Sequence, residues 1–157
     1  MLIVYLEIGV FYVKITNLTQ NPQTIVFKLM DLYTQKLITI LNRAPDIIEA
    51  ARLCSQHCPD GYVAGGAITQ TVWNDLTHQP LGAQIKDIDL VYFDPDRTLA
   101  DEKQLESMLN ANNTLSHKLD LTNEALTHTW YEDKFDASIE PYQCAEEAID
   151  VWLSAFA

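Results

Sequence analysis

Two aspartates, Asp87 and Asp89, lie within an otherwise apolar segment, KDIDLVYFD, which spans residues 86–94. This composition predicts a β-strand, and side chains alternate between the two faces of a strand. The two carboxylates therefore point to the same side, with backbone positions about 6.5–7 Å apart. Neighbouring carboxylates repel each other, and burial raises the pKa of at least one. An arrangement that is costly by itself points to a compensating interaction.

Three explanations of this pair are compatible with the residues alone. The aspartates are solvated at the start of a strand, or one of them pairs with a nearby base such as Lys86 or Arg97. In the third explanation, they bind a divalent metal ion, Mg²⁺ or Mn²⁺. Such ions prefer carboxylate oxygens, and their charge removes the repulsion between the two acids.

A diglycine, Gly65-Gly66, supports the third explanation. It follows a short apolar segment, YVA, and precedes AITQTVWNDL, whose apolar residues recur at helical spacing. A strand that ends in glycines before a helix exposes backbone N–H groups at the helix N-terminus, which is a favourable place for phosphate. The Asp-x-Asp strand is the next predicted strand in the chain. The two segments together predict a triphosphate site beside metal ligands.

The remaining pattern is an alternation of helices and strands. Apolar periodicity and Pro or Gly breaks predict helices over 31–41, 45–56, 67–76, 98–110, 124–131 and 145–153, and strands over 62–64, 86–94 and 117–121. This order predicts an α/β or α+β sheet domain. Residues 1–24 are expected to form an N-terminal extension, and residues 25–157 the domain itself. Trp73 and Trp130 are expected in the core.

The composition fits one globular domain. The chain has 157 residues, 48% of them hydrophobic, and no apolar run is long enough to cross a bilayer. The apolar start carries Glu7 and Lys14, which argues against a secretory signal. Three cysteines form no even disulfide framework, so we expect a cytoplasmic protein. In CSQHC, Cys54 and Cys58 are interpreted as core residues, or as part of a zinc site if further ligands exist.

The net charge limits the partners of the protein. Ten basic against 22 acidic residues give −12. This charge opposes non-specific binding to nucleic acid or to anionic membranes. A polyanion can still bind locally where divalent cations stand between the two negative partners.

Four segments, in order, resemble the motifs of a bacterial nucleotidyltransferase-like family within the DNA polymerase β-type superfamily. They are VAGGAITQTVWNDL, KDIDLVYFD, LDLTNEALTHTWY and PYQCAEEAIDVW, and the resemblance covers about residues 31–152. It implies the nucleotidyltransferase fold, a mixed β-sheet flanked by helices. It also implies an enzyme that transfers an NMP group from an NTP to a hydroxyl acceptor, which the sequence does not identify.

The resemblance assigns roles to individual residues. It implies that Asp87 and Asp89 bind two Mg²⁺ ions (or Mn²⁺) and that Asp120 is a third carboxylate, acting as metal ligand or general base. The residues that it implies for nucleotide binding are Gly65, Gly66, Thr69, Asn123 and His128. Asn123 could instead cap a helix, and His128 could be structural.

The chain also departs from the family pattern. Thr69 and Leu126 stand where arginines are expected, and Glu124 stands where glutamine is expected. Arginine suits phosphate well, so these losses weaken triphosphate binding unless Lys86, Lys118 or Arg97 compensates.

The tail is shorter than the family pattern, so we expect a C-terminally truncated domain whose apolar end favours a homo-oligomer. Two functions stay open: an active nucleotidyltransferase, or a degenerate, inactive member with a binding or regulatory role. An acidic protein-interaction module is a third, less supported by the glycine and aspartate spacing.

Overall fold

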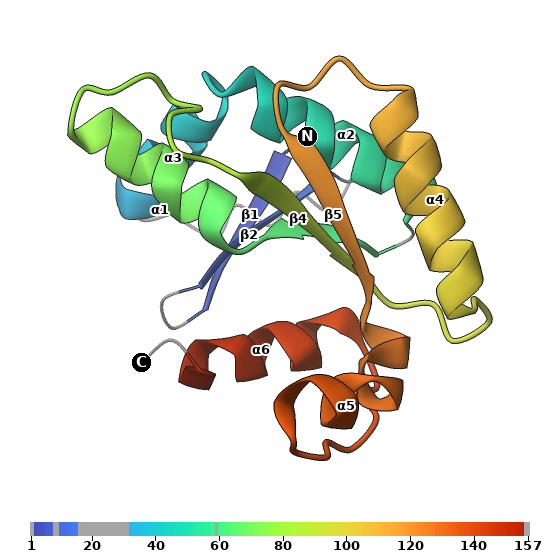
Figure 1. Ribbon diagram of the computed structural model, residues 1–157. Coiled ribbons are helices and arrows are strands. Elements are labelled where there is room, and N and C mark those ends of the chain that lie inside the picture. The colour runs from blue at the N-terminus through green and yellow to red at the C-terminus, as the bar shows by residue number, and fades with distance from the viewer. Residues whose placement is uncertain (1, 8–9, 16–31, 59, 156–157) are drawn as a thin grey trace, which may run out of the picture.

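One five-stranded mixed sheet organises the protein (Figure 1). The computed structural model describes residues 2–7, 10–15, 32–58 and 60–155. The strands lie in the order β1 (Leu2–Glu7), β2 (Val10–Ile15), β3 (Tyr62–Ala64), β4 (Asp87–Tyr92) and β5 (Lys118–Asn123). Neighbouring strands are antiparallel except β4 and β5, which are parallel. Parallel neighbours need a crossover connection, and α4 (Leu99–Ala111) lies in the one that joins β4 to β5.

Helices cover both faces of the sheet (Figure 1). Helices α1 (Leu32–Leu41), α2 (Pro45–His57), α3 (Gly66–Leu76) and α4 pack on one face. Their core contains Ile88 and Leu90 of β4 and Leu119 and Leu121 of β5. On the other face lies α6 (Ala145–Ala155), against Tyr62, Ala64 and Val91. The expected fold class, a mixed sheet flanked by helices, is confirmed.

Side chains of α4 bind the outer edge of β5. Three residues spaced by four reach the strand from one side of the helix: Glu102, Glu106 and Asn110. Asn110 Nδ2 donates to the carbonyl of Leu119 at 2.9 Å, and Leu119 N–H donates to Asn110 Oδ1 at 2.9 Å. The backbone N–H groups of Leu121 and Asn123 donate to the two glutamates. The helix thus replaces a sixth strand and protects an edge that could otherwise pair with another chain.

The first residues of the chain take part in the sheet. Residues 1–24, expected as an extension, contain β1 and β2, and Val13 of β2 pairs with Val63 of β3. The expected boundary at residues 24–25 lies outside the described residues, so the division into extension and domain stays a prediction. Of the residues described, no helix has the length and apolarity to span a membrane.

Two expectations are wrong, one about a helix and one about the burial of a side chain. Residues 124–131 do not form one α-helix; they form the 3₁₀ helix η1 (Glu124–Thr129) and the start of α5 (Tyr131–Phe135). The β-branched Thr127 and Thr129 disfavour a longer α-helix there.

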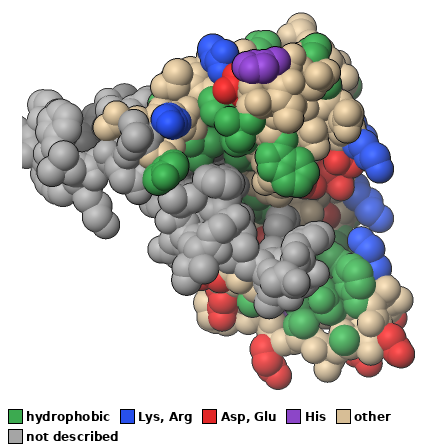
Figure 2. Space-filling view, turned by 90° about the vertical axis from the view of Figure 1, so that its left-hand side faces the viewer, with side chains coloured by type: hydrophobic (Ala, Val, Ile, Leu, Met, Phe, Trp, Pro, Cys, Tyr) green, Lys and Arg blue, Asp and Glu red, His purple; other side chains and the backbone are tan. Residues whose placement is uncertain are grey.

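The second wrong expectation concerns Trp73, which is not a core residue: it is 60% exposed on α3. Leu76 on the same helix and Tyr33 on α1 are also exposed. The side of the molecule on which α1 and α3 lie shows hydrophobic side chains at its surface (Figure 2). The helical period alone does not distinguish this surface from a face that packs on the sheet.

Candidate functional site

Three carboxylates share the sheet face opposite α1–α4. In the parallel register of β4 and β5, Asp89 lies beside Asp120, and Asp87 lies beside Lys118. The intervening Ile88 is fully buried in the core on the other face. Asp87 and Asp120 are exposed, and Asp89 is partly buried. The structure therefore gathers Asp87, Asp89 and Asp120 where the two strands begin.

The electrostatics of Asp89 reflect this crowding. Burial raises the pKa of its carboxyl to about 6, and the negative charges of Asp87 and then Asp120 contribute to the increase. A hydrogen bond from its own backbone acts in the opposite direction but does not cancel the effect. Without a cation, ionised Asp89 therefore has an unfavourable electrostatic energy, and a bound cation would offset it.

Gly65 brings the diglycine into contact with Asp89. Its neighbour Ala64 pairs with Asp89 across β3 and β4. Gly65 has φ 72° and ψ −151°, a backbone conformation that is essentially restricted to glycine. A Cβ at this position would lie 2.4 Å from Asp89 Oδ2. The carboxylate therefore occupies the space that only a glycine leaves open.

A cavity of about 200 Å³ joins these carboxylates to the N-terminus of α3. Its lining residues are Gly66, Ala67, Gln70, Gln84, Ile85, Lys86, Asp87 and Asp89. The N-cap of α3, Gly65, has no side-chain cap, and the first turn has no acidic residue. The N–H groups of this turn therefore remain available to an anion. An anion and the carboxylates can share this cavity when a cation lies between them.

The donor set fits a divalent ion that binds together with phosphate. Within the described part of the chain, no three His, Cys, Asp or Glu side chains are placed to hold one metal ion by themselves. Mg²⁺ is typically held by one or two carboxylates, with substrate phosphates and water completing its shell. Asp87 and Asp89 supply such a pair. The assignment of Asp120 as a third ligand stays a prediction.

The other residues expected at the site lie elsewhere or have other contacts. Asn123 is fully buried, at the far end of β5 from the acidic start of the strand. Its Oδ1 accepts from the N–H groups of Asp94 and Ala125, and its Nδ2 donates to the carbonyl of Asp94. It therefore caps η1, which is one of the two interpretations of its sequence position. His128 lies on η1, and Thr69 is not among the residues that line the cavity.

The cavity also contains residues that sequence reasoning did not assign to it. Gln70 and Gln84 line it, and so does Lys86, which the sequence offered as one of three basic candidates. The other two are engaged: Lys118 Nζ lies 3.0 Å from Glu106 Oε1, and Arg97 Nε lies 3.1 Å from Asp94 Oδ2. The sequence signal that could have placed Lys86 in the cavity was its position directly before Asp87.

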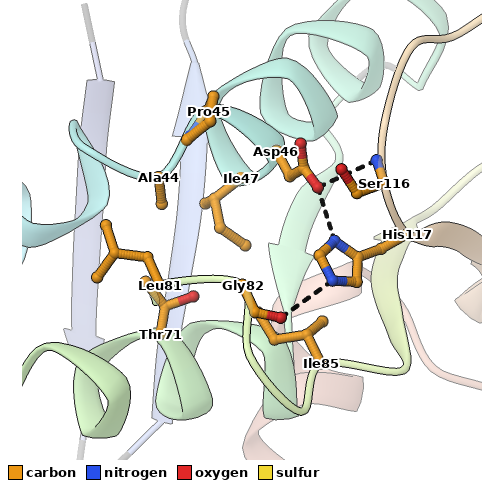
Figure 3. A pocket seen from close by; sticks show the side chains of 10 residues that line it. All are labelled: Ala44, Pro45, Asp46, Ile47, Thr71, Leu81, Gly82, Ile85, Ser116 and His117. Carbon is orange, nitrogen blue, oxygen red and sulfur yellow. Dashed lines mark hydrogen bonds and ion pairs between the residues drawn. The ribbon is translucent and has the colours of Figure 1, made fainter. Parts of the chain in front are cut away.

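A second cavity, of about 340 Å³, is lined by the start of α2, by α3, by the loop that leads into β4 and by the residues just before β5 (Figure 3). His117, just before β5, spans its wall. One ring nitrogen of His117 lies 2.6 Å from Asp46 Oδ2 at the start of α2, and the other lies 3.1 Å from the carbonyl oxygen of Gly82 (Figure 3). These contacts connect the loop that precedes β4 to α2 and to the start of β5.

The two glycines should respond differently to substitution. Gly65→Ala forces a side chain into a strained backbone conformation and against Asp89, so we expect a loss of about 1–3 kcal/mol in the free energy of unfolding. Gly66→Ala is the matched control, because a Cβ there meets nothing within 4 Å. At this helical position alanine should be neutral or stabilising. Urea unfolding of both variants tests the prediction, and equal losses would contradict it.

The chain is similar to known nucleotidyltransferases in sequence and in fold. A family model described as nucleotidyltransferase matches residues 51–157. A solved NMR structure, described as revealing a CCA-adding enzyme head domain, matches with a TM-score of 0.58 and 21% sequence identity. The match covers 73% of this chain and 57% of the other, so this chain spans less than two thirds of that protein. No curated protein matches significantly. At this identity the solved structure supports the fold alone.

Proposed function

Because this chain belongs to the nucleotidyltransferase family, whose model matches it over residues 51–157, we propose that it transfers an NMP group from an NTP to a hydroxyl acceptor. The reaction would depend on Mg²⁺ or Mn²⁺. The observation that carries the proposal is the contact of Gly65 with the Asp89 carboxylate, where a Cβ would lie 2.4 Å from Oδ2. It supports an anion-binding helix N-terminus directly beside paired metal ligands.

The residues of the cavity and the neighbouring Asp120 have distinct roles in this proposal. Gly66 and the first turn of α3 bind phosphate through backbone N–H groups. Asp87 and Asp89 hold divalent ions, which when bound would neutralise charge on the phosphates and on the leaving pyrophosphate. Asp120, exposed beside Asp89, accepts the proton of the acceptor hydroxyl. The acceptor oxygen bonds to the α-phosphorus as the bond from phosphorus to pyrophosphate breaks.

A second function, nucleotide or metal binding without transfer, is favoured by the missing arginines at Thr69 and Leu126. Leu126 is partly buried on η1 and is not among the cavity-lining residues, and its side chain has no donor or charge for phosphate. No disulfide joins Cys54, Cys58 and Cys144, all of which lie among the described residues, and this supports a reducing, cytoplasmic location for either function.

Calorimetry distinguishes these functions. Each NTP is titrated into the protein with Mg²⁺, and again with EDTA. We expect at least one NTP to bind with a submillimolar Kd only when Mg²⁺ is present, because the carboxylates otherwise repel the triphosphate. Release of pyrophosphate in the presence of candidate hydroxyl acceptors then reports transfer. Metal-dependent binding without any release would support the inactive form, and no NTP binding at millimolar concentration would contradict both.

A further inference from the structure

Among the described residues, Lys86 is the one basic side chain that lines the cavity between the α3 N-terminus and the aspartates. It is exposed, and in the part of the chain that the structure describes it makes no ion pair or hydrogen bond. The other two basic candidates are engaged: Lys118, on the strand beside Asp87, pairs with Glu106, and Arg97, beyond the far end of β4, pairs with Asp94. Lys86 therefore has a positive charge that is available at the cavity, although Asp87 follows it directly.

Side chains of other elements anchor the loop that precedes Lys86. Three successive carbonyl groups accept hydrogen bonds from side chains on other elements: those of Leu81, Gly82 and Ala83. The buried Asn74 of α3 donates to the first and third, at 2.9 and 2.7 Å. A ring nitrogen of His117 lies 3.1 Å from the second (Figure 3). The ring packs so closely that a Cβ on Gly82 would lie 3.0 Å from His117 Cε1. The stretch that leads into Lys86 is thus attached to α3 and to the start of β5.

The cavity also has neutral polar groups beside this charge. Gln70 of α3 lies one helical turn after Gly66, and Gln84 of the loop has a φ of 64°. Both line the cavity together with Lys86. Two glutamine amides, a lysine and the N–H groups of a helix N-terminus form a donor-rich wall in the same cavity as Asp87 and Asp89, with Gln70 Nε2 also donating to Asn74 Oδ1 at 2.9 Å. Such a wall suits the oxygens of a phosphate chain.

We propose that Lys86 binds the triphosphate of the nucleotide substrate, in the role that the family pattern gives to an arginine at the position of Thr69. The proposal rests on the proposed function, since it assigns a residue of the same site. Lysine binds phosphate as a point charge without the planar fork of arginine. It therefore recognises the accumulated charge of the chain of phosphates rather than the geometry of one phosphate. ATP should depend on Lys86 more strongly than AMP does.

Calorimetry with Mg²⁺ and ATP, ADP or AMP tests Lys86 in four proteins: wild type, Lys86→Gln, Lys86→Arg and Lys118→Gln. A charge-assisted contact implies that Lys86→Gln weakens ATP binding about 10- to 100-fold. AMP binding should change less than about threefold, and Lys86→Arg should retain ATP binding. Lys118→Gln removes the same charge from the neighbouring strand and should leave the affinity for ATP near that of wild type.

A purely structural Lys86 gives a different result. If Lys86 only offsets the charge of Asp87, its loss should lower the Tm of the ligand-free protein and affect all three nucleotides alike. That result would overturn the inference, and so would an equal effect of Lys86→Gln and Lys118→Gln or unchanged ATP binding in Lys86→Gln. Failure of wild type to bind any nucleotide would instead overturn the proposed function. Mn²⁺ binding followed by electron paramagnetic resonance, without nucleotide, should be retained in Lys86→Gln.

Discussion

Asp89→Asn should stabilise the metal-free protein and abolish its binding of divalent metal. Burial and the charges of Asp87 and Asp120 raise the pKa of Asp89 from 3.8 to about 6. A carboxyl whose pKa is higher in the folded state lowers stability as the pH rises from about 4 to about 6, and the full cost persists above that range. The neutral amide removes this cost. Since the carboxylate is partly open to solvent, we expect a gain of about 1–2 kcal/mol at pH 8.

The same substitution should eliminate the functional site. Asparagine has no negative charge with which to hold Mg²⁺, so transfer activity should fall at least about 100-fold. Excess Mg²⁺ should raise the Tm of wild type at pH 8 but not that of Asp89→Asn, because a ligand stabilises only the state that binds it. Urea unfolding with EDTA and with Mg²⁺ measures both effects in one series.

Asp94→Asn is the matched control for Asp89→Asn. Asp94 follows the same strand, but its carboxylate pairs with Arg97 and accepts from the N–H of Asp96. Its substitution should leave the response to Mg²⁺ intact and should not stabilise the protein. The proposed site would be refuted if Asp89→Asn kept its affinity for metal, or if both variants lost that affinity equally.

Glu124→Gln should raise the free energy of unfolding by about 3 kcal/mol at pH 8 and have little effect at pH 5. Glu124 is 1% exposed, and burial raises its pKa to about 7, with a further contribution from the charge of Glu102. Its Oε2 accepts from Thr127 Oγ1 at 2.8 Å, whereas Oε1 has no hydrogen-bond partner among the described residues. One hydrogen bond therefore has to offset the cost of burying the negative charge of ionised Glu124.

The sign of the pH dependence follows from the direction of this pKa change. The folded state holds its proton more tightly than the unfolded state, so wild type loses stability as the pH rises from about 4.5 to about 7. Glutamine keeps an acceptor for Thr127 and carries no charge, so the contribution of residue 124 to the pH dependence of stability disappears. It is also the residue that the family pattern places here.

Unfolding curves at pH 5, 6, 7 and 8 test the prediction for Glu124. Glu132→Gln, an exposed glutamate on α5, is the matched control and should leave the slope unchanged. A wild-type stability that does not vary between pH 5 and pH 8, or a Glu124→Gln variant less stable at pH 8, would contradict the prediction.

The sequence by itself was sufficient for most helices and strands between residues 32 and 123, and for the side of the strand on which the acids lie. Alternation within KDIDLVYFD put Asp87 and Asp89 on one face, and the structure shows Ile88 in the core of the other. The diglycine before a helix was also recognisable, because Gly65 needs a backbone conformation that other residues avoid. Such features depend on near neighbours in the chain, so local patterns reveal them.

Only the tertiary structure decided which of these features meet. The contact between Gly65 and Asp89 depends on the register of β3 and β4, and the position of Asp120 depends on the register of β4 and β5. Asn123 is bound to Asp94 and Ala125 instead of facing the acids, and Lys86 lines the cavity because distant side chains hold its loop. Periodicity tells on which face a side chain lies but not what lies opposite, since strand pairing and loop packing join residues far apart in the chain.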